Sequence, residues 1–376
     1  MRLFFVCKQF SLRRDFIADR YWRLWHLPAE LARRGHAVSG MACSYYREHA
    51  PGLDLAVAPG TLRWSTRRLS ILSPPSWRAW LGELYARAAA FAPEAIVASS
   101  DALQLWAGAR VARALGVPLV VDFYDNYESY GASRLPLVRG ALRLAARQAA
   151  ALTYVSTPLR EYLTARYGLR APGLTLENAV EPAFGAAPPR AEARAALGLP
   201  AHARLLGTAG ALDASRNIAA LYGAFERLAA EDPGLYLVLA GEPRLAPPAH
   251  PRVIALGTLA PDRMPAFWAA LDVASIGLRD DAFGRYCYPQ KLAEIEAVGT
   301  PMVFPRIGVF ARGDAAALGV ALESNSAEGL AAAVRRQLSD PRAPALRPEG
   351  WAAMAGRFES VLKQALAAGP ASGARP

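Results

Sequence analysis

Short apolar runs alternate along the chain with longer amphipathic stretches. In the first half the predicted strands cover 2–7, 36–43, 95–100, 118–124 and 152–156. In the second half they cover 204–210, 235–241, 253–257, 273–277, 301–305 and 319–324. Strands that alternate with helices in this way are typical of parallel sheets whose strands are joined by crossover helices.

The amphipathic stretches predict the crossover helices. Residues 20–35 and 101–116 have apolar positions at helical spacing, and each stretch stops at a glycine, Gly35 or Gly116, that can end a helix. Further helices are predicted over 217–232, 261–272 and 351–367.

A Pro- and Ala-rich segment near 181–190 interrupts the pattern, which then restarts. We therefore predict an α/β protein with two Rossmann-like, doubly wound parallel-sheet domains, residues 1–181 and 182–367, that face each other across a cleft. The last helix can return to the first domain, and 368–376 is predicted to be a disordered tail. Ligands of such sheets bind at the carboxyl ends of the strands.

The net charge is concentrated in the first half. Residues 1–181 hold 23 Lys and Arg against 14 Asp and Glu, a net +9 of the +11 for the whole chain. Six of the eight tryptophans lie there too. Arginine interleaved with tryptophan suits an anionic membrane surface, although an arginine-rich composition with tryptophans in the core explains it as well. Single-stranded nucleic acid is a third reading, and we do not predict it as the partner.

Other features of the composition exclude several classes of protein. The three cysteines, Cys7, Cys43 and Cys287, form no CxxC pair, which argues against a disulfide framework and a cysteine-rich zinc site. The five histidines show no HxxxH spacing, so no metal site is predicted. No apolar run approaches the ~20 residues of a membrane span. We expect a cytoplasmic protein, either free or peripheral on the inner face of the plasma membrane.

The segment FGRYCYPQKLAEIEAVGTPMVFP carries the first chemical candidates. A helix should begin near Pro289 and place Lys291 and Glu294, three residues apart, on one face near its N-terminus. A carboxylate there can accept hydrogen bonds from vicinal hydroxyls, and the cation with the helix N-terminus can hold a diphosphate. An ion pair on a solvated helix is the alternative.

This segment resembles the retaining GT-B glycosyltransferases of family 4 (glycosyl transferases group 1). Their pattern has Glu, seven residues, then a second Glu before Ala-x-Gly-x-Pro and an apolar strand. Glu294 takes the place of the second Glu, five residues before Gly299, and Tyr286 stands where the first belongs. The resemblance implies that Glu294 binds the ribose of a nucleotide-sugar. YPQKLAE fits the branch of the family with YP-x-K ahead of the Glu.

The segment TAGALDASRNIAALYGAF is similar to the family's phosphate-binding turn. The resemblance implies that the backbone at Gly210 approaches the nucleotide-sugar and that Arg216, with Lys291, holds the diphosphate. Arg285 is a reserve cation. We predict Arg216 and Lys291 as the catalytic residues, and Gly210, Arg285, Tyr286 and Glu294 as further nucleotide-sugar contacts.

The first half resembles the family in RYWRLWHLPAELARRGHAV and in LENAVEPAF, while QFSLRRDFIADR stands in place of the family's Gly-Gly loop. VVDFYDNYESY follows a predicted strand, so its polar groups are candidates for the acceptor side. They are Asp122, Tyr124, Asp125, Asn126 and Glu128. An Asx-rich turn without chemistry is the alternative.

The resemblance implies a glycosyltransferase that moves a sugar from a nucleoside diphosphate sugar to a hydroxyl acceptor. It further implies retention at the anomeric carbon and no metal or other cofactor. The cationic first half favours a lipid-linked or envelope glycan as acceptor. The alternatives are a non-catalytic nucleotide-sugar-binding protein and a sugar-nucleotide epimerase on the same scaffold.

Overall fold

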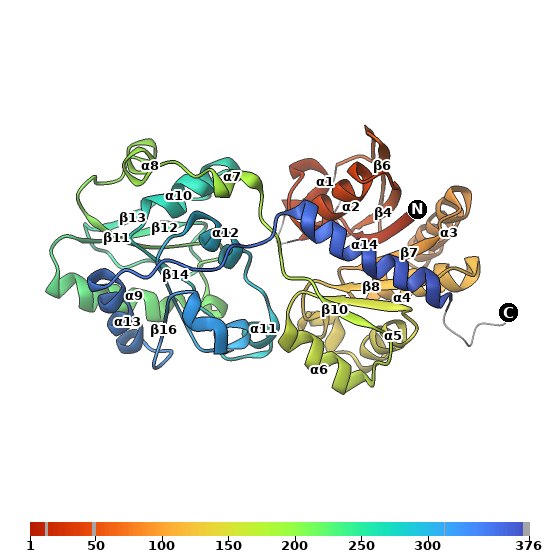
Figure 1. Ribbon diagram of the computed structural model, residues 1–376. Coiled ribbons are helices and arrows are strands. Elements are labelled where there is room, and N and C mark those ends of the chain that lie inside the picture. Colours follow the sequence, from red (N-terminus) through yellow and green to blue (C-terminus); the bar gives the residue numbers. More distant parts are fainter. Residues whose placement is uncertain (12–13, 47–49, 312, 371–376) are drawn as a thin grey trace. The chain divides into compact units, whose positions relative to one another are not determined.

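The computed structural model describes residues 1–11, 14–46, 50–311 and 313–370, and the chain divides into two compact units (Figure 1). Unit 1 comprises residues 1–177 with the C-terminal segment from Trp351, and unit 2 comprises 178–350. Most of the predicted disordered tail, residues 371–376, lies outside the described residues.

Unit 1 is built on an eight-stranded sheet with the order β10-β9-β8-β7-β1-β4-β6-β5. All neighbours are parallel except β5, which pairs antiparallel with β6 at the edge. The strands are β1 (Arg2–Lys8), β4 (Ala37–Ser44), β5 (Leu53–Val57), β6 (Gly60–Arg68), β7 (Ala95–Ser99), β8 (Leu119–Phe123), β9 (Ala151–Tyr154) and β10 (Gly173–Thr175). The short strands β2 (Phe10–Ser11) and β3 (Arg14–Asp15) pair separately.

Helices cover this sheet, and Figure 1 shows the last helix of the chain, α14, lying on it beside α2. The unit 1 helices are α1 (Phe16–Asp19), α2 (Arg23–Arg33), α3 (Pro74–Phe91), α4 (Ala102–Leu115), α5 (Pro136–Arg147), α6 (Thr157–Tyr167) and α14 (Trp351–Ala368), with single 3₁₀ turns η1 (Tyr127–Ser129) and η2 (Gly131–Arg134). Burial of five successive residues in β1, β7 and β8 matches the continuous apolar runs from which these strands were predicted.

The tryptophans of the first half serve the interior of unit 1 rather than its surface. Trp25, Trp64 and Trp80 are buried, and the other three are half-buried. Trp64 packs edge-on against Phe5 and Phe16 in the core. Three of the six rings therefore belong to the core, and a membrane-facing role stays a prediction for the three half-buried ones.

Unit 2 has a six-stranded, all-parallel sheet with the order β13-β12-β11-β14-β15-β16. The strands are β11 (Arg204–Ala209), β12 (Leu235–Ala240), β13 (Val253–Ala255), β14 (Val273–Ser275), β15 (Met302–Phe304) and β16 (Val320–Ala321). The helices are α7 (Pro182–Gly185), α8 (Arg190–Leu197), α9 (Ile218–Glu231), α10 (Met264–Ala270), α11 (Ala282–Tyr286), α12 (Gln290–Val298) and α13 (Ala327–Ser339). The 3₁₀ turns are η3 (Ala214–Arg216), η4 (Pro261–Arg263), η5 (Gly308–Ala311) and η6 (Gly313–Ala317).

The units divide at 177/178, four residues before the boundary that the sequence suggested, and the chain crosses back to unit 1 at Trp351. The Pro- and Ala-rich segment is not an extended linker, because α7 and the start of α8 form within it. Pro182 occupies the first turn of α7, where a missing backbone N–H costs nothing.

The described cysteines Cys7, Cys43 and Cys287 are buried free thiols. None of the described helices combines the length and the apolar character that a membrane span requires.

Candidate functional site

The site in unit 2 begins at the carboxyl end of its central strand, β11. Gly210 follows the strand with a φ of 102°, a conformation that side chains other than glycine rarely adopt. A Cβ placed on Gly210 would meet nothing within 4 Å. The backbone at this point therefore has free space beside it, and the approach of a ligand to Gly210 stays a prediction.

A tight turn after Gly210 positions Arg216 at the end of η3. Asp213 caps this turn by accepting hydrogen bonds from the Ser215 N–H and hydroxyl, at 3.0 and 2.6 Å. The guanidinium of Arg216 lies 4.4 Å from the centre of the Phe283 ring, which fixes it by a cation–π contact while leaving its N–H groups available in the plane. Arg216 is half-buried and directly precedes Asn217, the N-cap residue of α9.

Asn325 holds the start of α9, a role that the sequence did not reveal. Asn217, the N-cap residue, has a left-handed φ of 48° and donates through Nδ2 to Asn325 Oδ1 at 2.9 Å. Asn325 in turn donates to the Leu278 carbonyl at 2.8 Å. Since the Asn217 side chain is engaged there, it does not cap the first N–H groups of α9. Exposed N–H groups at a helix start attract an anion.

Lys291, in the first turn of α12, extends to the same strand end. Its Nζ lies 3.4 Å from the hydroxyl of Thr208, which is itself held by the Ser275 carbonyl at 2.8 Å. Burial, and next the positive charge of Arg216, lower the pKa of Lys291 to about 7. Two cations that repel each other in a half-buried place are stabilised by a bound anion.

Glu294 lies one turn further along α12 and is buried, with 8% of its surface exposed. Its Oε2 accepts a hydrogen bond from the indole N–H of Trp268 at 2.9 Å, and burial raises the pKa of the carboxyl to about 7. Oε1 accepts no hydrogen bond from any residue within the described ranges. Trp268 thus orients the carboxyl and leaves one oxygen for hydroxyl groups of a ligand.

Arg216 and Lys291 line one small cavity, whereas Gly210 and Glu294 are not among its lining residues. The polar residues of the lining are Thr208, Arg216, Asn217, Ser275, Lys291 and Asn325. The electrostatic coupling of Lys291 to both Arg216 and Glu294 places the three predicted side chains in one neighbourhood. The arrangement suits a ligand that carries a diphosphate next to a polyhydroxyl ring.

We expect Gly277→Ala to lower the affinity for nucleoside diphosphates about tenfold. A Cβ at Gly277 would overlap the carbonyl oxygen of Arg216, so the turn that carries Arg216 must shift. Isothermal titration with UDP measures the loss. Gly185→Ala is the matched control, because a Cβ there meets nothing within 4 Å. Equal UDP affinity in the two variants would show that the close approach at Gly277 does not position Arg216.

Two predicted contacts are placed differently. Arg285 is exposed and pairs with Asp280 through two hydrogen bonds of 2.6 and 3.2 Å, and it does not line the cavity. Tyr286 ends α11, half-buried, and is likewise outside the lining. The structure therefore places Arg216 and Lys291 in the cavity lining, Gly210 directly before the lining residue Ala211, and Glu294 close enough to Lys291 to act on its charge, and it leaves Arg285 and Tyr286 outside the lining.

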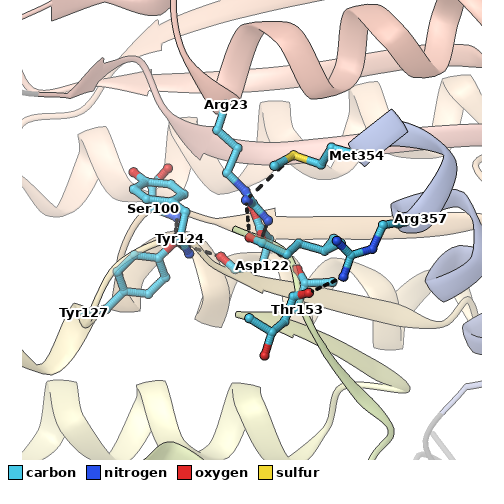
Figure 2. A network of polar contacts seen from close by, with 10 residues as sticks. Arg23, Ser100, Asp122, Tyr124, Tyr127, Thr153, Met354 and Arg357 are labelled. Atoms are coloured by element: carbon cyan, nitrogen blue, oxygen red, sulfur yellow. Dashed lines mark hydrogen bonds and ion pairs between the residues drawn. The ribbon is translucent and has the colours of Figure 1, made fainter. Parts of the chain in front are cut away.

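In unit 1 the first acceptor-side candidate, Asp122, belongs to a buried ion pair. Arg23 donates to both carboxylate oxygens, at 2.9 and 2.7 Å, and Thr153 donates to Oδ1 at 2.6 Å (Figure 2). The same guanidinium donates to the Leu176 carbonyl at 2.8 Å. Since every Asp122 oxygen is used internally, we assign this residue to stability and not to the acceptor side.

Tyr127 forms a second buried link, which no sequence pattern had marked. Its hydroxyl donates to the Asp122 carbonyl at 2.8 Å and accepts from the N–H groups of Ser100 and Tyr124, at 2.9 and 3.2 Å (Figure 2). Tyr124 is buried against Trp22 and Tyr127. The Tyr124 ring thus belongs to the packing of this edge.

The remaining three candidates differ in exposure. Asn126 caps η1 and is buried. Glu128 binds α6, accepting hydrogen bonds from Tyr162 and Tyr167 at 2.6 and 2.8 Å and from Arg166. Burial acts to raise the pKa of Glu128, but these hydrogen bonds outweigh it and lower the pKa. Asp125, which accepts from the Tyr130 hydroxyl at 2.9 Å, is half-buried at the strand end.

The fold and the unit 2 site define a protein of the GT-B class, and comparison with known families agrees. The family described as "Glycosyl transferase 4-like domain" matches residues 22–179, and "Glycosyl transferases group 1" matches 203–340. The chain belongs to these glycosyltransferases. No match was found among curated protein sequences.

Solved structures share the whole architecture. Sucrose-phosphate synthase from Thermosynechococcus elongatus has 17% identity and a TM-score of 0.74 over 98% of this chain and 100% of its own. HepE from Anabaena, in complex with UDP-glucose, has 16% identity and a TM-score of 0.63 over 98% of both chains. The α,α-trehalose 6-phosphate synthase of Burkholderia multivorans has 16% identity and a TM-score of 0.63 over 98% of this chain and 93% of its own. The predicted fold is thereby confirmed.

Proposed function

We propose that this glycosyltransferase moves a sugar from a nucleoside diphosphate sugar, bound by unit 2, to a hydroxyl group of a saccharide acceptor, bound by unit 1. The observation that carries the proposal is the pair of mutually repelling cations, Arg216 and Lys291, at the open end of β11. HepE was solved with UDP-glucose, so UDP-glucose is the first sugar donor to test.

The cations act on the leaving group. As the bond between the anomeric carbon and the phosphate oxygen breaks, negative charge grows on the diphosphate, and fixed cations stabilise it without reorganisation. Each charge-assisted hydrogen bond from Arg216 or Lys291 contributes about 1.5–3 kcal/mol. Loss of one that forms only in the transition state slows turnover about ten- to a hundredfold.

Binding of nucleotides tests the proposal directly. Isothermal titration with UDP, GDP and ADP and with UDP-glucose should give a saturable site for at least one nucleotide. Arg216→Met should remove most of that affinity, whereas Arg285→Met, outside the cavity lining, should preserve it. No binding by any of the nucleotides, or equal binding by both variants, would refute the assignment of the site.

Glu294→Gln should weaken UDP-glucose binding about tenfold near pH 7 and change its pH dependence. Ionisation of Glu294 favours acceptance of ribose hydroxyls as the pH rises through about 7, whereas deprotonation of Lys291, also near 7, weakens diphosphate binding. The wild-type affinity should therefore peak close to pH 7. Gln keeps an acceptor for Trp268 but does not titrate, so the acid limb of the profile should flatten. Titrations between pH 5.5 and 8.5 measure this; an unchanged acid limb would exclude Glu294.

Retention and metal independence complete the proposal. Retention is supported by the sequence pattern shared with the retaining family, and metal independence by the two side-chain cations at the diphosphate position. NMR of the anomeric proton in the product distinguishes retention from inversion and from epimerisation of the sugar donor. Turnover that persists in EDTA supports metal independence, and turnover that stops until Mg²⁺ is added contradicts it.

We further propose that unit 1 docks on an anionic membrane through α5 and the loop before α3, which would deliver a lipid-linked acceptor. Residues 129–160 contain five arginines and no Asp or Glu. Leu137, at the start of α5, is 88% exposed, and Leu72, before α3, is 95% exposed. Crossover helices begin at the carboxyl edge of a parallel sheet, so both leucines lie at the same edge. Arginines next to exposed leucines suit an anionic lipid surface.

Co-sedimentation with vesicles of phosphatidylglycerol and phosphatidylcholine tests this docking. Leu72→Asp with Leu137→Asp should reduce the bound fraction at least tenfold, since each buried leucine contributes about 1.5–3 kcal/mol. Leu346→Asp is the matched control, an exposed leucine of unit 2. Binding that survives the double change, or that is equal on neutral vesicles, would refute the docking face without affecting the nucleotide site.

A further inference from the structure

A second group of chemically active side chains lies at the carboxyl edge of the unit 1 sheet. Lys8 ends β1, Tyr45 follows β4, Asp101 follows β7 and Asp125 follows β8. These four strands are adjacent, in the order β8-β7-β1-β4. The carboxyl edge of a doubly wound sheet is where its ligands bind. Of the four residues, only Asp125 was a candidate from the sequence.

The ammonium of Lys8 lies over an aromatic ring. Its backbone N–H donates to the Ser100 hydroxyl at 3.1 Å, and its Nζ lies 4.6 Å from the centre of the Tyr130 ring. Within the described ranges, no residue accepts a hydrogen bond from this Nζ. Burial lowers the pKa of Lys8, while the charges of Asp101 and Asp125 act against that shift. The ammonium thus has donor capacity for a ligand.

Asp101 combines a structural role with spare acceptor capacity. Its Oδ1 accepts from the Leu103 N–H at 3.0 Å and so caps α4. In the orientation that satisfies the Gln104 amide, its Nε2 donates to both Asp101 oxygens, at 3.2 Å to Oδ2, and its Oε1 accepts from the Tyr45 hydroxyl at 3.1 Å. The Tyr45 hydroxyl lies 3.5 Å from Oδ2, too far for a strong hydrogen bond, so Oδ2 has one close protein donor. Burial raises the pKa of Asp101, and the charge of Lys8 opposes this. The cap fixes the carboxyl, and Oδ2, with two lone pairs, can still accept from a ligand.

We propose that Lys8 and Asp101 form the acceptor subsite and bind adjacent hydroxyl groups of an uncharged saccharide. A sugar hydroxyl both donates and accepts, so one hydroxyl can accept from Lys8 while its neighbour donates to Asp101. The inference rests on the proposed glycosyl transfer and specifies its acceptor.

The charges at this edge favour a neutral acceptor over a phosphorylated one. The carboxylates of Asp101 and Asp125 both act on the single ammonium of Lys8. A phosphate brought to Lys8 would therefore meet two negative groups as well as one positive group, and like charges at short range are repulsive. The cationic pair of unit 2, Arg216 with Lys291, shows the opposite balance.

The chain offers a matched set of variants, because Lys8, Lys291 and Lys363 are its only lysines. Saturation-transfer NMR would measure binding of octyl β-D-glucoside, octyl β-D-galactoside and octyl α-D-mannoside, with glucose 6-phosphate as the anionic probe. For a glycoside that binds the wild type, Lys8→Met and Asp101→Asn should each weaken binding at least tenfold. Asn remains a good helix cap, so Asp101→Asn should fold. Lys363→Met, on an exposed lysine, should leave binding unchanged.

UDP titration of the same variants separates this inference from the proposed function. Lys8→Met should bind UDP as the wild type does, since Lys8 lies in unit 1 and the nucleotide site in unit 2. If the wild type binds none of UDP, GDP, ADP and UDP-glucose, the proposed function fails. The acceptor subsite alone is overturned if a nucleotide binds but no glycoside does, if glucose 6-phosphate binds in preference, or if Lys8→Met and Asp101→Asn keep full glycoside affinity.

Discussion

Lys291→Met should slow turnover about ten- to a hundredfold and should also raise the melting temperature of the ligand-free protein. The loss follows from the removal of a cation that faces the diphosphate. The melting temperature should rise because burial and the charge of Arg216 disfavour the charged form of Lys291 in the folded state and lower its pKa to about 7. The ammonium of Lys291, which faces the diphosphate, thus destabilises the ligand-free protein.

The increase in melting temperature on Lys291→Met should depend on pH. Between pH 7 and the ordinary lysine value of 10.5, the unfolded chain holds a proton on Lys291 that the folded chain has released. The free energy of unfolding of the wild type therefore rises with pH between these two values. The advantage of Lys291→Met in thermal melts should be greatest at pH 7 or below and shrink towards pH 10. Lys363→Met should show neither effect, and a variant that loses stability at pH 7 would contradict the argument.

The second large effect concerns stability. Arg23→Met should lower the free energy of unfolding of unit 1 by about 3–5 kcal/mol, because Asp122 remains as a buried carboxylate without its partner. The double change Arg23→Met with Asp122→Leu should recover a large part of this, since apolar side chains can replace a buried ion pair. Urea denaturation of Arg23→Met, of Asp122→Leu and of the double variant measures the coupling free energy between the two side chains. A loss below about 1 kcal/mol for Arg23→Met, the range of exposed pairs, would contradict a buried pair.

The unit 2 site could be predicted from the sequence because its residues are close together along the chain. Lys291 and Glu294 lie on one helical turn, and Arg216 follows the glycine that ends β11 after a short turn. Spacing along a helix is enough by itself to define a shared face. Trp268 and Asn325 were missed because each reaches the site from another part of unit 2, and no local pattern marks such a contact.

The candidate residues of unit 1 could not be assigned from the sequence, because their partners are far away along the chain. Asp122 lies in the apolar strand β8 and was an acceptor-side candidate, but its partner Arg23 is 99 residues earlier in the chain. The acidic residues of 122–128 could therefore not be sorted into structural and open ones from sequence. The burial of Trp64 and Trp80 could not be predicted from sequence for a similar reason, since it depends on packing between distant elements. The strands and crossover helices were predictable because their apolar periodicity is local.

The return of α14 to unit 1 sets the order in which the protein can mature during synthesis. Trp351 stacks on His26 with ring centres 5.0 Å apart, and Glu359 accepts a hydrogen bond from Arg34 at 2.7 Å, so residues from both ends of the chain complete one core. Unit 2 is contiguous and has all its residues as soon as Gly350 is made. Unit 1 must wait for the final helix to leave the ribosome. Until then its nascent sheet lacks one of its covering helices and exposes apolar surface, and any truncation before Trp351 should leave it in that state.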